Sequence, residues 1–472
     1  MIGYRYYSAF IAAKVMALDD SRVTPAHTRY DGHNYYPTSK WVLFGHHFSA
    51  ISGAGPLIGP TLAAQFGYLP GTLWLIIGVV LAGAVQDFII LFASMRRDGK
   101  SLGQMAREEI NPTAGFIAMV AVLSIMAILL AVLALIVVNA LAHSPWGLFT
   151  IACTIPIALL MGWWLHRFRP GKVLETSLIG VVLTLFAVVA GGWVADNPAW
   201  AAVFTVEKTT LVWLMAGYGF IASVLPVWVL LCPRDYLSTF LKIGTILGLA
   251  AGILLTLPTM KMPAMTQFVD GTGPVFSGKL FPFAFITVAC GAISGFHALV
   301  ASGTTPKMLT REGDARMVGY GAMLMESFVG VMAMVAAGIL DPGVYFAINA
   351  PAGVVGGTLA EATRTIATWG FVVSPEDMSR LASEMGEESL LARTGGAPSG
   401  TTGESRGRPT SGVPAAHVGP RIAVHREPDD ASVDEHLDLL DPVRVRGEAA
   451  LVFEFFSRAP REPDEELLDL AE

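Results

Sequence analysis

Long apolar runs constrain this chain more than any other feature of its sequence. A helix needs about 20 mostly apolar residues to cross the hydrocarbon core of a bilayer, which is about 30 Å thick. Ten segments meet or approach that length: 41–66, 69–95, 114–139, 147–165, 173–195, 211–232, 243–259, 280–302, 317–340 and 343–373. The last is the weakest, because Glu361 and Arg364 interrupt it, and an eleventh run at 2–17 is short. The pattern predicts an all-α polytopic membrane protein.

The composition excludes the soluble classes of protein. Apolar residues make up 53% of the chain and charged residues 15%, whereas a soluble domain carries about 25% charged residues. The cysteines Cys153, Cys232 and Cys290 show no disulfide or metal spacing, no catalytic motif is present, and no basic surface suggests nucleic acid. We therefore expect that the chain is not an enzyme and that it binds no cofactor or metal. The expected partners are a small-molecule substrate and the lipid bilayer, and the oligomeric state stays open.

Positive charge alternates between the connections that link these segments. Lys and Arg gather at 96–112, 166–172 and 303–316 and in a short connection at 234–242, whereas 140–146 has none. Loops rich in Lys and Arg stay on the cytoplasmic side of a membrane. The basic connections are therefore expected to face the cytoplasm, which places the protein in the cell inner membrane.

Both ends of the chain depart from this pattern. If the alternation is extended toward the N-terminus, the connection 18–40 lies on the cytoplasmic side of the membrane. The span that begins almost at Met1 would then start on the opposite side, and this predicts a further helix upstream. From Ser374 the chain becomes polar, rich first in Gly, Pro, Ser and Thr and then in Asp, Glu and Arg. Two interpretations stay open for this tail: a disordered segment or the product of a shifted reading frame.

Residues 41–66 combine more Gly and Pro than an unbroken helix accepts. The run reads WVLFGHHFSAISGAGPLIGPTLAAQF, and in a helix interior Gly costs about 1 kcal/mol and Pro about 3 kcal/mol relative to Ala. At membrane depth, unwound backbone survives only where protein, water or ligand meets its polar groups. A close helix–helix contact through small residues is the structural alternative, but this density of Gly and Pro favours a discontinuous helix.

A second interrupted segment lies at 211–232, with Gly217, Gly219, Ser223 and Pro226. It is the sixth span if 41–66 is the first, so it crosses the membrane in the opposite direction. Paired broken helices in two inverted halves point to a secondary transporter. The expected division is an N-terminal span and connection at 1–40, inverted halves at 41–195 and 196–373, and a polar tail at 374–472.

The two expected breaks supply a candidate substrate site. Half-helix ends carry partial charges that attract carboxylates and cations, and nearby hydroxyls and open backbone would contact a substrate. Histidine titrates near physiological pH, although a histidine bonded to local backbone fits the same pattern, and only one of two adjacent histidines is expected to face the site. The substrate-binding candidates are His46, His47, Ser49, Ser52, Gly53, Gly55, Gly217, Gly219 and Ser223.

Polar residues inside other spans are candidates for a coupling ion or proton. Asp87 lies nine residues before Arg96, or about 13 Å along a helix. An intramembrane carboxylate is costly and is a functional candidate by default. Gln86 precedes Asp87, and Glu326 lies deep in 317–340. An internal ion pair that fixes helix packing is the structural alternative for both carboxylates.

Three long motifs are specific enough to indicate a family: GHHFSAISGAGPLIGPTLAAQFGYLPG, LAGAVQDFIILFASMRRDGKSLGQMAREEI and SGFHALVASGTTPK. These motifs resemble the carbon starvation protein A family. The resemblance runs from about Tyr4 to Pro398 and implies a LeuT-like five-plus-five inverted repeat with discontinuous helices. In transporters of this type the eighth span lies beside the first and helps to hold a coupling cation. The resemblance therefore adds Ser294, His297, Ser302, Thr304 and Thr305 as coupling candidates.

The resemblance also implies a function, which is uptake of short peptides or pyruvate during carbon starvation, coupled to protons or, as second choice, to sodium. Family members carry another helix before Met1 and further spans after TGGAP, where this chain has SGTTGESRGRPT. The resemblance thus favours a truncated or frameshifted chain, and an inactive fragment stays an alternative. A haem-bearing electron carrier that uses His46 and His297, and a membrane sensor, are weaker alternatives.

Overall fold

The computed structural model describes residues 1–142, 144–168, 172–356, 358–374, 376–378 and 380. Over this part the chain forms helices and connecting loops, with an isolated parallel bridge between Thr38 and Leu309. The prediction of an all-α protein is confirmed there, whereas the predicted tail lies almost wholly outside these residues. The α-helices are α1 (Ser8–Phe10), α2 (Pro25–Thr28), α3 (Lys40–Ile51), α4 (Gly55–Ala63), α5 (Tyr68–Gly78), α6 (Ala84–Arg96), α7 (Leu102–Glu109), α8 (Pro112–Leu141), α9 (Pro145–Trp163), α10 (Val173–Asp196), α11 (Pro198–Phe204), α12 (Lys208–Val224), α13 (Leu231–Thr256), α14 (Leu280–Thr287), α15 (Ala289–Ala292), α16 (Gly295–Ala301), α17 (Ala322–Ile339), α18 (Pro342–Asn349), α19 (Ala352–Val355) and α20 (Leu359–Thr368).

Six helical stretches in the described part of the chain are long and apolar enough to cross a membrane. This finding supports the prediction of a polytopic membrane protein. Each of the six overlaps one of the ten apolar segments expected from the sequence. The stretches are Tyr68–Arg96, Pro112–Leu141, Pro145–Phe168, Val173–Asp196, Leu231–Thr256 and Arg316–Ile339.

Local sequence signals explain where several of these helices begin. The Asn111 side chain accepts a hydrogen bond from the backbone N–H of Ala114 at the start of α8, and Pro112 follows at the first helical position. Ser144 caps α9 in the same way and is also followed by a proline. Side-chain acceptors satisfy N–H groups that a helix leaves free, and proline loses no intrahelical bond at this position.

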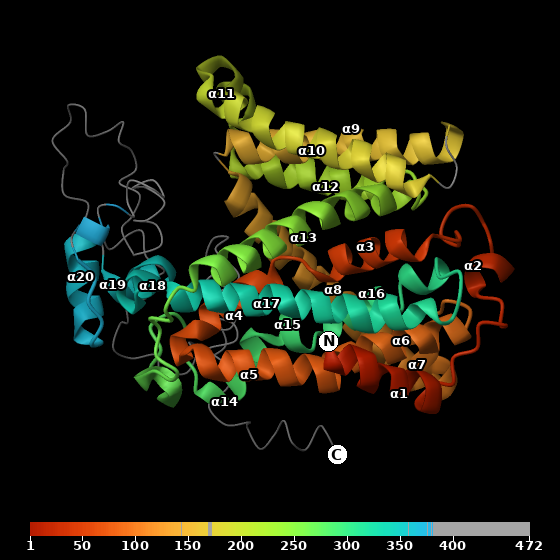
Figure 1. Cartoon of the computed structure of the whole chain (residues 1–472), viewed down its shortest axis with the longest axis horizontal. Helices are drawn as coiled ribbons and strands as arrows, with labels where there is room; N and C mark the ends of the chain where they lie inside the picture. Colours follow the sequence, from red (N-terminus) through yellow and green to blue (C-terminus); the bar gives the residue numbers. More distant parts are fainter. Residues whose placement is uncertain (143, 169–171, 357, 375, 379, 381–472) are drawn as a thin grey trace, which may run out of the picture. The chain divides into compact units, whose positions relative to one another are not determined.

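Contacts divide the chain into two compact units. The first comprises Met1–Pro60, Thr72–Leu257 and Val288–Ala333. Within it α9 packs along α10, α3 packs against α13, and α16 packs against both α3 and α6 (Figure 1). Pairing of α16 with α3 brings residues from the eighth expected span beside the first.

Within the first unit, α2 and the adjoining ends of α9 and α10 lie toward the right of the view, whereas α11 lies toward the left (Figure 1). α2 and the adjoining ends of α9 and α10 belong to connections that are rich in Lys and Arg, and α11 belongs to a connection that is poor in them. This arrangement agrees with the alternation of charge expected from the sequence.

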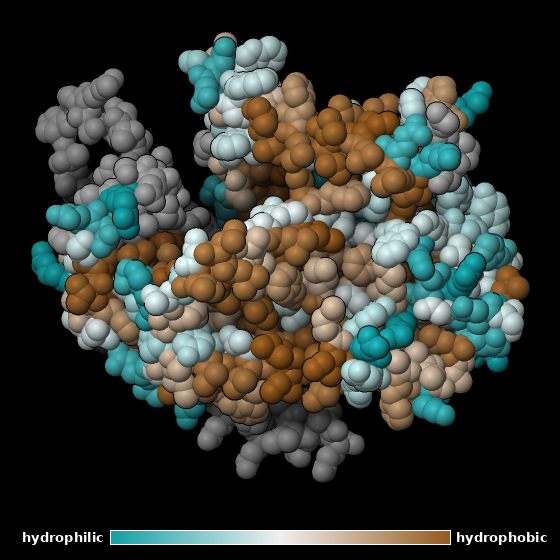
Figure 2. Space-filling model, in the orientation of Figure 1, coloured by the Kyte–Doolittle hydropathy of each residue, from teal (hydrophilic) through white to brown (hydrophobic). Residues whose placement is uncertain are grey.

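Large apolar side chains cover the outside of several helices in the first unit. Those of α10 and α12 stand exposed in the isolated chain, including Leu178, Val182 and Phe186 on α10 and Trp213 and Phe220 on α12. Figure 2 shows hydrophobic side chains over the region where α9, α10 and α12 lie. Such a surface suits lipid, because apolar patches of this extent are rare on soluble monomers.

The second unit comprises Thr61–Gly71, Pro258–Thr287 and the described residues from Met334 onward. The buried Gln65 amide organises part of it: its Oε1 accepts hydrogen bonds from the backbone N–H groups of Val275 and Phe276 at 3.1 and 3.3 Å. The Tyr345 hydroxyl donates to the Thr61 carbonyl at 2.8 Å. These contacts connect chain segments that are far apart in sequence.

The expected interruption of 211–232 lies at 225–230, around Pro226, and not at the glycines. α12 is continuous from Lys208 to Val224, and Gly217 and Gly219 lie on its exposed surface. The helix ends two residues before Pro226, because a residue that precedes proline disfavours the helical conformation. The expected connection at 234–242 is wrong, since these residues lie inside α13.

Two other expected spans are not single helices. Residues 280–302 form α14, α15 and α16, and Ile293 and Ser294 between the last two have extended dihedral angles. A further unwound stretch therefore lies within the eighth expected span. Residues 343–373, interrupted by charge in the sequence, form the short helices α18, α19 and α20. The boundary of the inverted halves at 195/196 stays a prediction.

Candidate functional site

The predicted break in 41–66 is confirmed. α3 ends at Ile51, Ser52 leaves the helical region with φ −81° and ψ 68°, and α4 begins at Gly55. Among the described residues, and apart from the chain neighbours of Gly53, no atom lies within 4 Å of the position that a Cβ on Gly53 would take. The backbone of this glycine is therefore open to a ligand.

The second unwound stretch lies against the first. A Cβ on Gly55 would lie 2.6 Å from Cys290 Sγ, so only glycine allows this approach between α4 and α15. Likewise, a Cβ on Gly83 would lie 2.1 Å from the Ala292 carbonyl oxygen. The Gln86 amide donates a hydrogen bond to the Ser294 carbonyl at 2.6 Å. Gln86 thus satisfies a carbonyl group that the unwound backbone leaves free.

Three of the predicted coupling residues form one buried cluster. His297 Nδ1 lies 3.2 Å from Asp87 Oδ2, and His297 Nε2 lies 3.1 Å from Glu326 Oε2. All three side chains are fully buried. They come from α16, α6 and α17, so sequence-distant helices bring them together. The imidazole joins two carboxylates that would otherwise be costly at this depth.

Cys290 extends this cluster. Its thiol donates to Glu326 Oε1 at 3.4 Å, and its Sγ lies 3.9 Å from His297 Nε2. Thiol, imidazole and carboxylate donors all lie within 4.8 Å of one another, a spacing that a metal ion also accepts. We assign no metal to these side chains, because the imidazole already has a carboxylate at each nitrogen.

The adjacent histidines of α3 face different partners, as expected from their spacing. His46 Nδ1 lies 3.0 Å from Asp235 Oδ2 on α13. His47 Nδ1 lies 2.9 Å from Thr305 Oγ1, and its Nε2 is buried with no hydrogen-bond partner among the described residues. His46 and His297 are each paired with carboxylates, and this pairing gives no support to haem ligation by the two.

Ser49 and Ser52 meet a lysine at the end of α3. Lys242 Nζ donates to the carbonyl oxygens of Ser49 and Ser52 at 2.9 and 2.7 Å. It also lies 3.2 Å from Ser49 Oγ, which in turn lies 2.5 Å from Ser238 Oγ. Lys242 and Ser238 of α13 therefore bind the residues at which α3 ends.

Four predicted residues do not join these contacts. Ser302 donates to the Ala298 carbonyl within its own segment at 2.7 Å. Gly217, Gly219 and Ser223 are exposed on α12, and Ser223 donates to the Phe220 carbonyl of the same helix. A lipid-facing position on a continuous helix offers a substrate no open backbone, so we leave these three out of the site that we propose.

Sequence reasoning missed three contributors. Asp235 and Lys242 were expected in the short connection at 234–242, and Cys290 was expected to take no part in a disulfide or a metal site. The sequence around Lys242 also allows a different prediction. Lys242 lies among apolar residues that continue to Thr256, so it could equally be predicted as a charge inside a membrane span. Cys290 carried no signal of its role, since its partner Glu326 lies 36 residues away.

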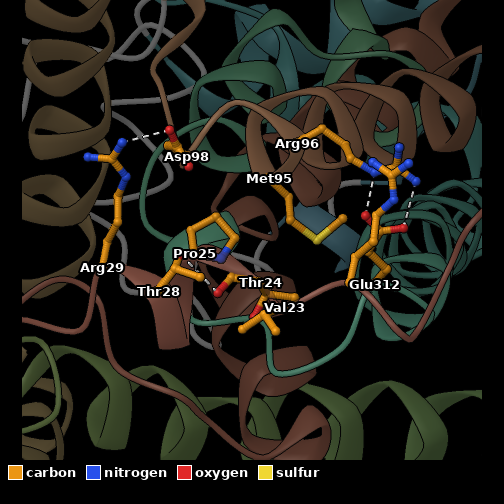
Figure 3. A pocket seen from close by; sticks show the side chains of 10 residues that line it. Val23, Thr24, Pro25, Thr28, Arg29, Met95, Arg96, Asp98 and Glu312 are labelled. Carbon is orange, nitrogen blue, oxygen red and sulfur yellow. Dashed lines mark hydrogen bonds and ion pairs between the residues drawn. The ribbon is translucent and has the colours of Figure 1, made fainter.

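A cavity of about 470 Å³ lies apart from these residues, between the segment around α2 and the end of α6 (Figure 3). Ion pairs line it: Arg29 Nη2 lies 2.7 Å from Asp98 Oδ2, and Arg96 holds the buried Glu312 carboxylate through two nitrogens. Arg96 ends α6, the helix that carries Asp87. The lining contains none of the clustered residues.

Comparisons with known proteins agree on one family. The family described as Carbon starvation protein CstA matches residues 1–407. The chain is 60% identical over 403 residues to the peptide transporter CstA of Escherichia coli K12, covering 84% of this chain and 58% of that protein. It is 56% identical over 420 residues to the pyruvate/proton symporter BtsT of the same organism, and the match covers 84% of this chain and 59% of that protein.

A third relative is the peptide transporter CstA of Helicobacter pylori 26695, 59% identical over 397 residues, with 84% of this chain and 58% of that protein covered. The chain thus spans less than two thirds of the length of these curated relatives. No solved structure matches it. The family match covers most of the chain and includes every residue of the site described above, so the chain belongs to the carbon starvation protein CstA family.

Proposed function

We propose that this chain forms the core of an inner-membrane secondary transporter that takes up a small carboxylate-bearing nutrient together with protons. The observation that carries the proposal is the buried row Asp87–His297–Glu326 beside two unwound stretches of backbone. Buried ionisable residues inside a membrane protein mark ion and proton pathways. Unwound helices at the same depth supply free backbone groups to a substrate.

The proposed architecture is the LeuT-like five-plus-five inverted repeat. Its support is the discontinuous pair α3 and α4 and the packing of α16, from the eighth expected span, against α3. The halves would be 41–195 and 196–373. Alternating access would then move one group of helices against the other around the breaks.

The proposed substrate position is the break between α3 and α4. The first turn of α4 begins at Gly55, and a helix N-terminus attracts a carboxylate through its N–H groups and dipole. Ser52 and the open backbone of Gly53 border the same point. The unpaired Nε2 of His47 adds a further polar group on α3. The substrate class is short peptides or pyruvate, since relatives are named for both and each presents a carboxylate.

The proposed coupling ion is the proton. An imidazole with a carboxylate at each ring nitrogen can accept a proton on one side and release it on the other. Asp87 and Glu326 stand in those two positions. One relative is named a pyruvate/proton symporter, which favours protons over sodium.

The test is uptake into proteoliposomes that contain the 472-residue chain. Labelled pyruvate would be offered with and without an inward proton gradient, and unlabelled dipeptides would compete. We expect accumulation that requires the gradient. Competition by dipeptides would show that peptides share the site.

Two controls make this test decisive. Protein-free vesicles measure leakage, and Asp270→Asn removes an exposed carboxylate that lies outside the cluster. Gradient-independent uptake would overturn proton coupling. Absence of uptake of both pyruvate and labelled dipeptides by well-folded protein would overturn the proposed transport function.

A further inference from the structure

Lys242 places its ammonium group at the end of the broken helix α3. Its Nζ lies 2.9 Å from the Ser49 carbonyl oxygen, 2.7 Å from the Ser52 carbonyl oxygen and 3.2 Å from Ser49 Oγ. An ammonium group has three N–H donors. The number of oxygen acceptors therefore equals the number of donors.

The position of Lys242 makes this contact costly to maintain. The residue lies eleven positions into the membrane-length helix α13, or about 16 Å from its start. A charge at such depth is retained only where protein groups replace its hydration. Here the three oxygens of α3 do so.

The end of α3 is also where a cation is most stable. The last carbonyl groups of a helix lack intrahelical partners, and the helix dipole places partial negative charge there. Phe48 O accepts from the Ser52 N–H, and Ile51 O accepts from the Gly53 N–H. The carbonyls of Ser49 and Ser52 are directed instead to Lys242.

The charged neighbours of Lys242 are Asp235, Arg234 and Glu326, and Glu326 belongs to the buried cluster with His297. Asp235 lies seven residues before Lys242 on α13, but its carboxylate is paired with His46. Arg234 lies with its guanidinium 4.9 Å from the ring of Tyr218, directed to α12. The carbonyl oxygens of α3 are thus the atoms that Lys242 contacts at hydrogen-bond distance.

We propose that the Lys242 ammonium fills a cation position formed by the carbonyl oxygens at the broken end of α3. Carbonyl and hydroxyl oxygens at such an end are ligands that an alkali cation would accept. Because the lysine is covalently attached, the position is occupied in every molecule. Sodium and potassium are therefore excluded, and removal of the ammonium group opens a site for sodium.

The test measures sodium binding and needs no transport, so its outcome is independent of the proposed function. Thermal unfolding of purified protein would be followed in sodium chloride and in N-methylglucamine chloride at equal ionic strength. Wild-type protein should give the same Tm in both salts. Lys242→Met should show a Tm higher in sodium by at least about 2 °C and should retain radioactive sodium stoichiometrically.

Two variants serve as matched controls. Lys242→Arg keeps a cation on α13 and should stay indifferent to sodium. Lys261→Met removes an exposed lysine that is paired with Asp341 and should also stay indifferent. A folded Lys242→Met protein without a sodium response would overturn the proposal. If that variant does not fold, a sodium-induced rise in the wild-type Tm overturns the proposal, and an unchanged wild-type Tm supports it.

Discussion

His297 Nδ1 lies 3.2 Å from Asp87 Oδ2, and no water-accessible surface remains on either side chain. The two residues are separated by 210 positions in the sequence, and α16 packs against α6 to bring them together. A neutral packing contact would not need two ionisable groups at this depth. The contact is therefore the best place to test proton coupling by mutation.

Asp87→Asn should lower gradient-driven accumulation by at least about tenfold. The amide keeps the volume of the carboxylate but cannot exchange a proton with His297. Substrate exchange without a gradient should continue, because the break between α3 and α4 is untouched. Uptake and exchange measured in the same vesicles separate the two effects. Normal accumulation by the variant would remove Asp87 from the coupling role.

Two ion pairs that line one cavity should differ in their importance for stability. Arg96→Ala leaves the buried Glu312 carboxylate without its guanidinium, and such a loss costs about 3–5 kcal/mol. Arg29→Ala breaks a pair whose side chains are about half exposed, so its loss should destabilise the protein much less than loss of the Arg96–Glu312 pair. Thermal unfolding of both variants in detergent compares them. Equal changes in Tm would contradict this ranking.

Gly83 and Gly217 of the first unit should respond differently to replacement by alanine, which adds a methyl group. Gly83→Ala would place a Cβ 2.1 Å from the Ala292 carbonyl oxygen, which cannot move without displacing the second unwound stretch. We expect loss of uptake and a lower Tm. Gly217→Ala meets no atom within 4 Å and should stabilise α12 by about 1 kcal/mol. Loss of uptake by Gly217→Ala would restore that glycine to the substrate site.

The Asp31 carboxylate should make stability depend on pH. Burial raises the pKa of this carboxyl, but backbone N–H groups of His33, Tyr35 and Asn34 donate to it and hold the pKa below its ordinary value. A pKa lowered by folding contributes stability above the unfolded pKa, and this contribution disappears as pH falls through the folded value.

Asp31→Asn should therefore lower the Tm at neutral pH, and the difference from wild type should shrink at pH values below about 4. The matched control is Asp196→Asn at the exposed end of α10, which should leave the Tm unchanged at both pH values. A difference for Asp31→Asn that persists at low pH would show that its hydrogen bonds, and not its charge, are responsible.

Metal removal should leave uptake unchanged. The donor atoms of Cys290, His297 and Glu326 are close enough for an ion, but the relative named for its coupling ion uses protons. We expect treatment with a strong chelator to change the rate by less than about twofold. Elemental analysis of the purified protein supplies the second measurement. Stoichiometric metal together with loss of uptake after chelation would replace the proton interpretation.

Hydrophobic length and the run of Gly and Pro predicted the helices and the first break, because both act through local backbone energies. The interruption of 211–232 lies at Pro226 and not at Gly217 or Gly219, since these glycines weaken a helix without forcing it to end. The unwound stretch at Ile293 and Ser294 depends on a tertiary contact, because the Gln86 amide donates a hydrogen bond to the freed Ser294 carbonyl.

The site was predicted in part for the same physical reason. Asp87 and Glu326 were each unusual in an apolar span and could be singled out one at a time, whereas His297 was added through the family resemblance. Cys290 and Asp235 acquire a role only through helices that pack against them, and the charge of Lys242 was assigned to a loop. Sequence alone shows which charges are costly, and packing shows which groups stabilise them.

Gly55 lies against Cys290, and Gly83 lies against the Ala292 carbonyl, with no room for a methyl group at either contact. Both contacts hold α15, the short helix that leads into the second unwound stretch. If the proposed transport cycle moves this helix, it has to carry the starts of α4 and α6 with it or separate both contacts.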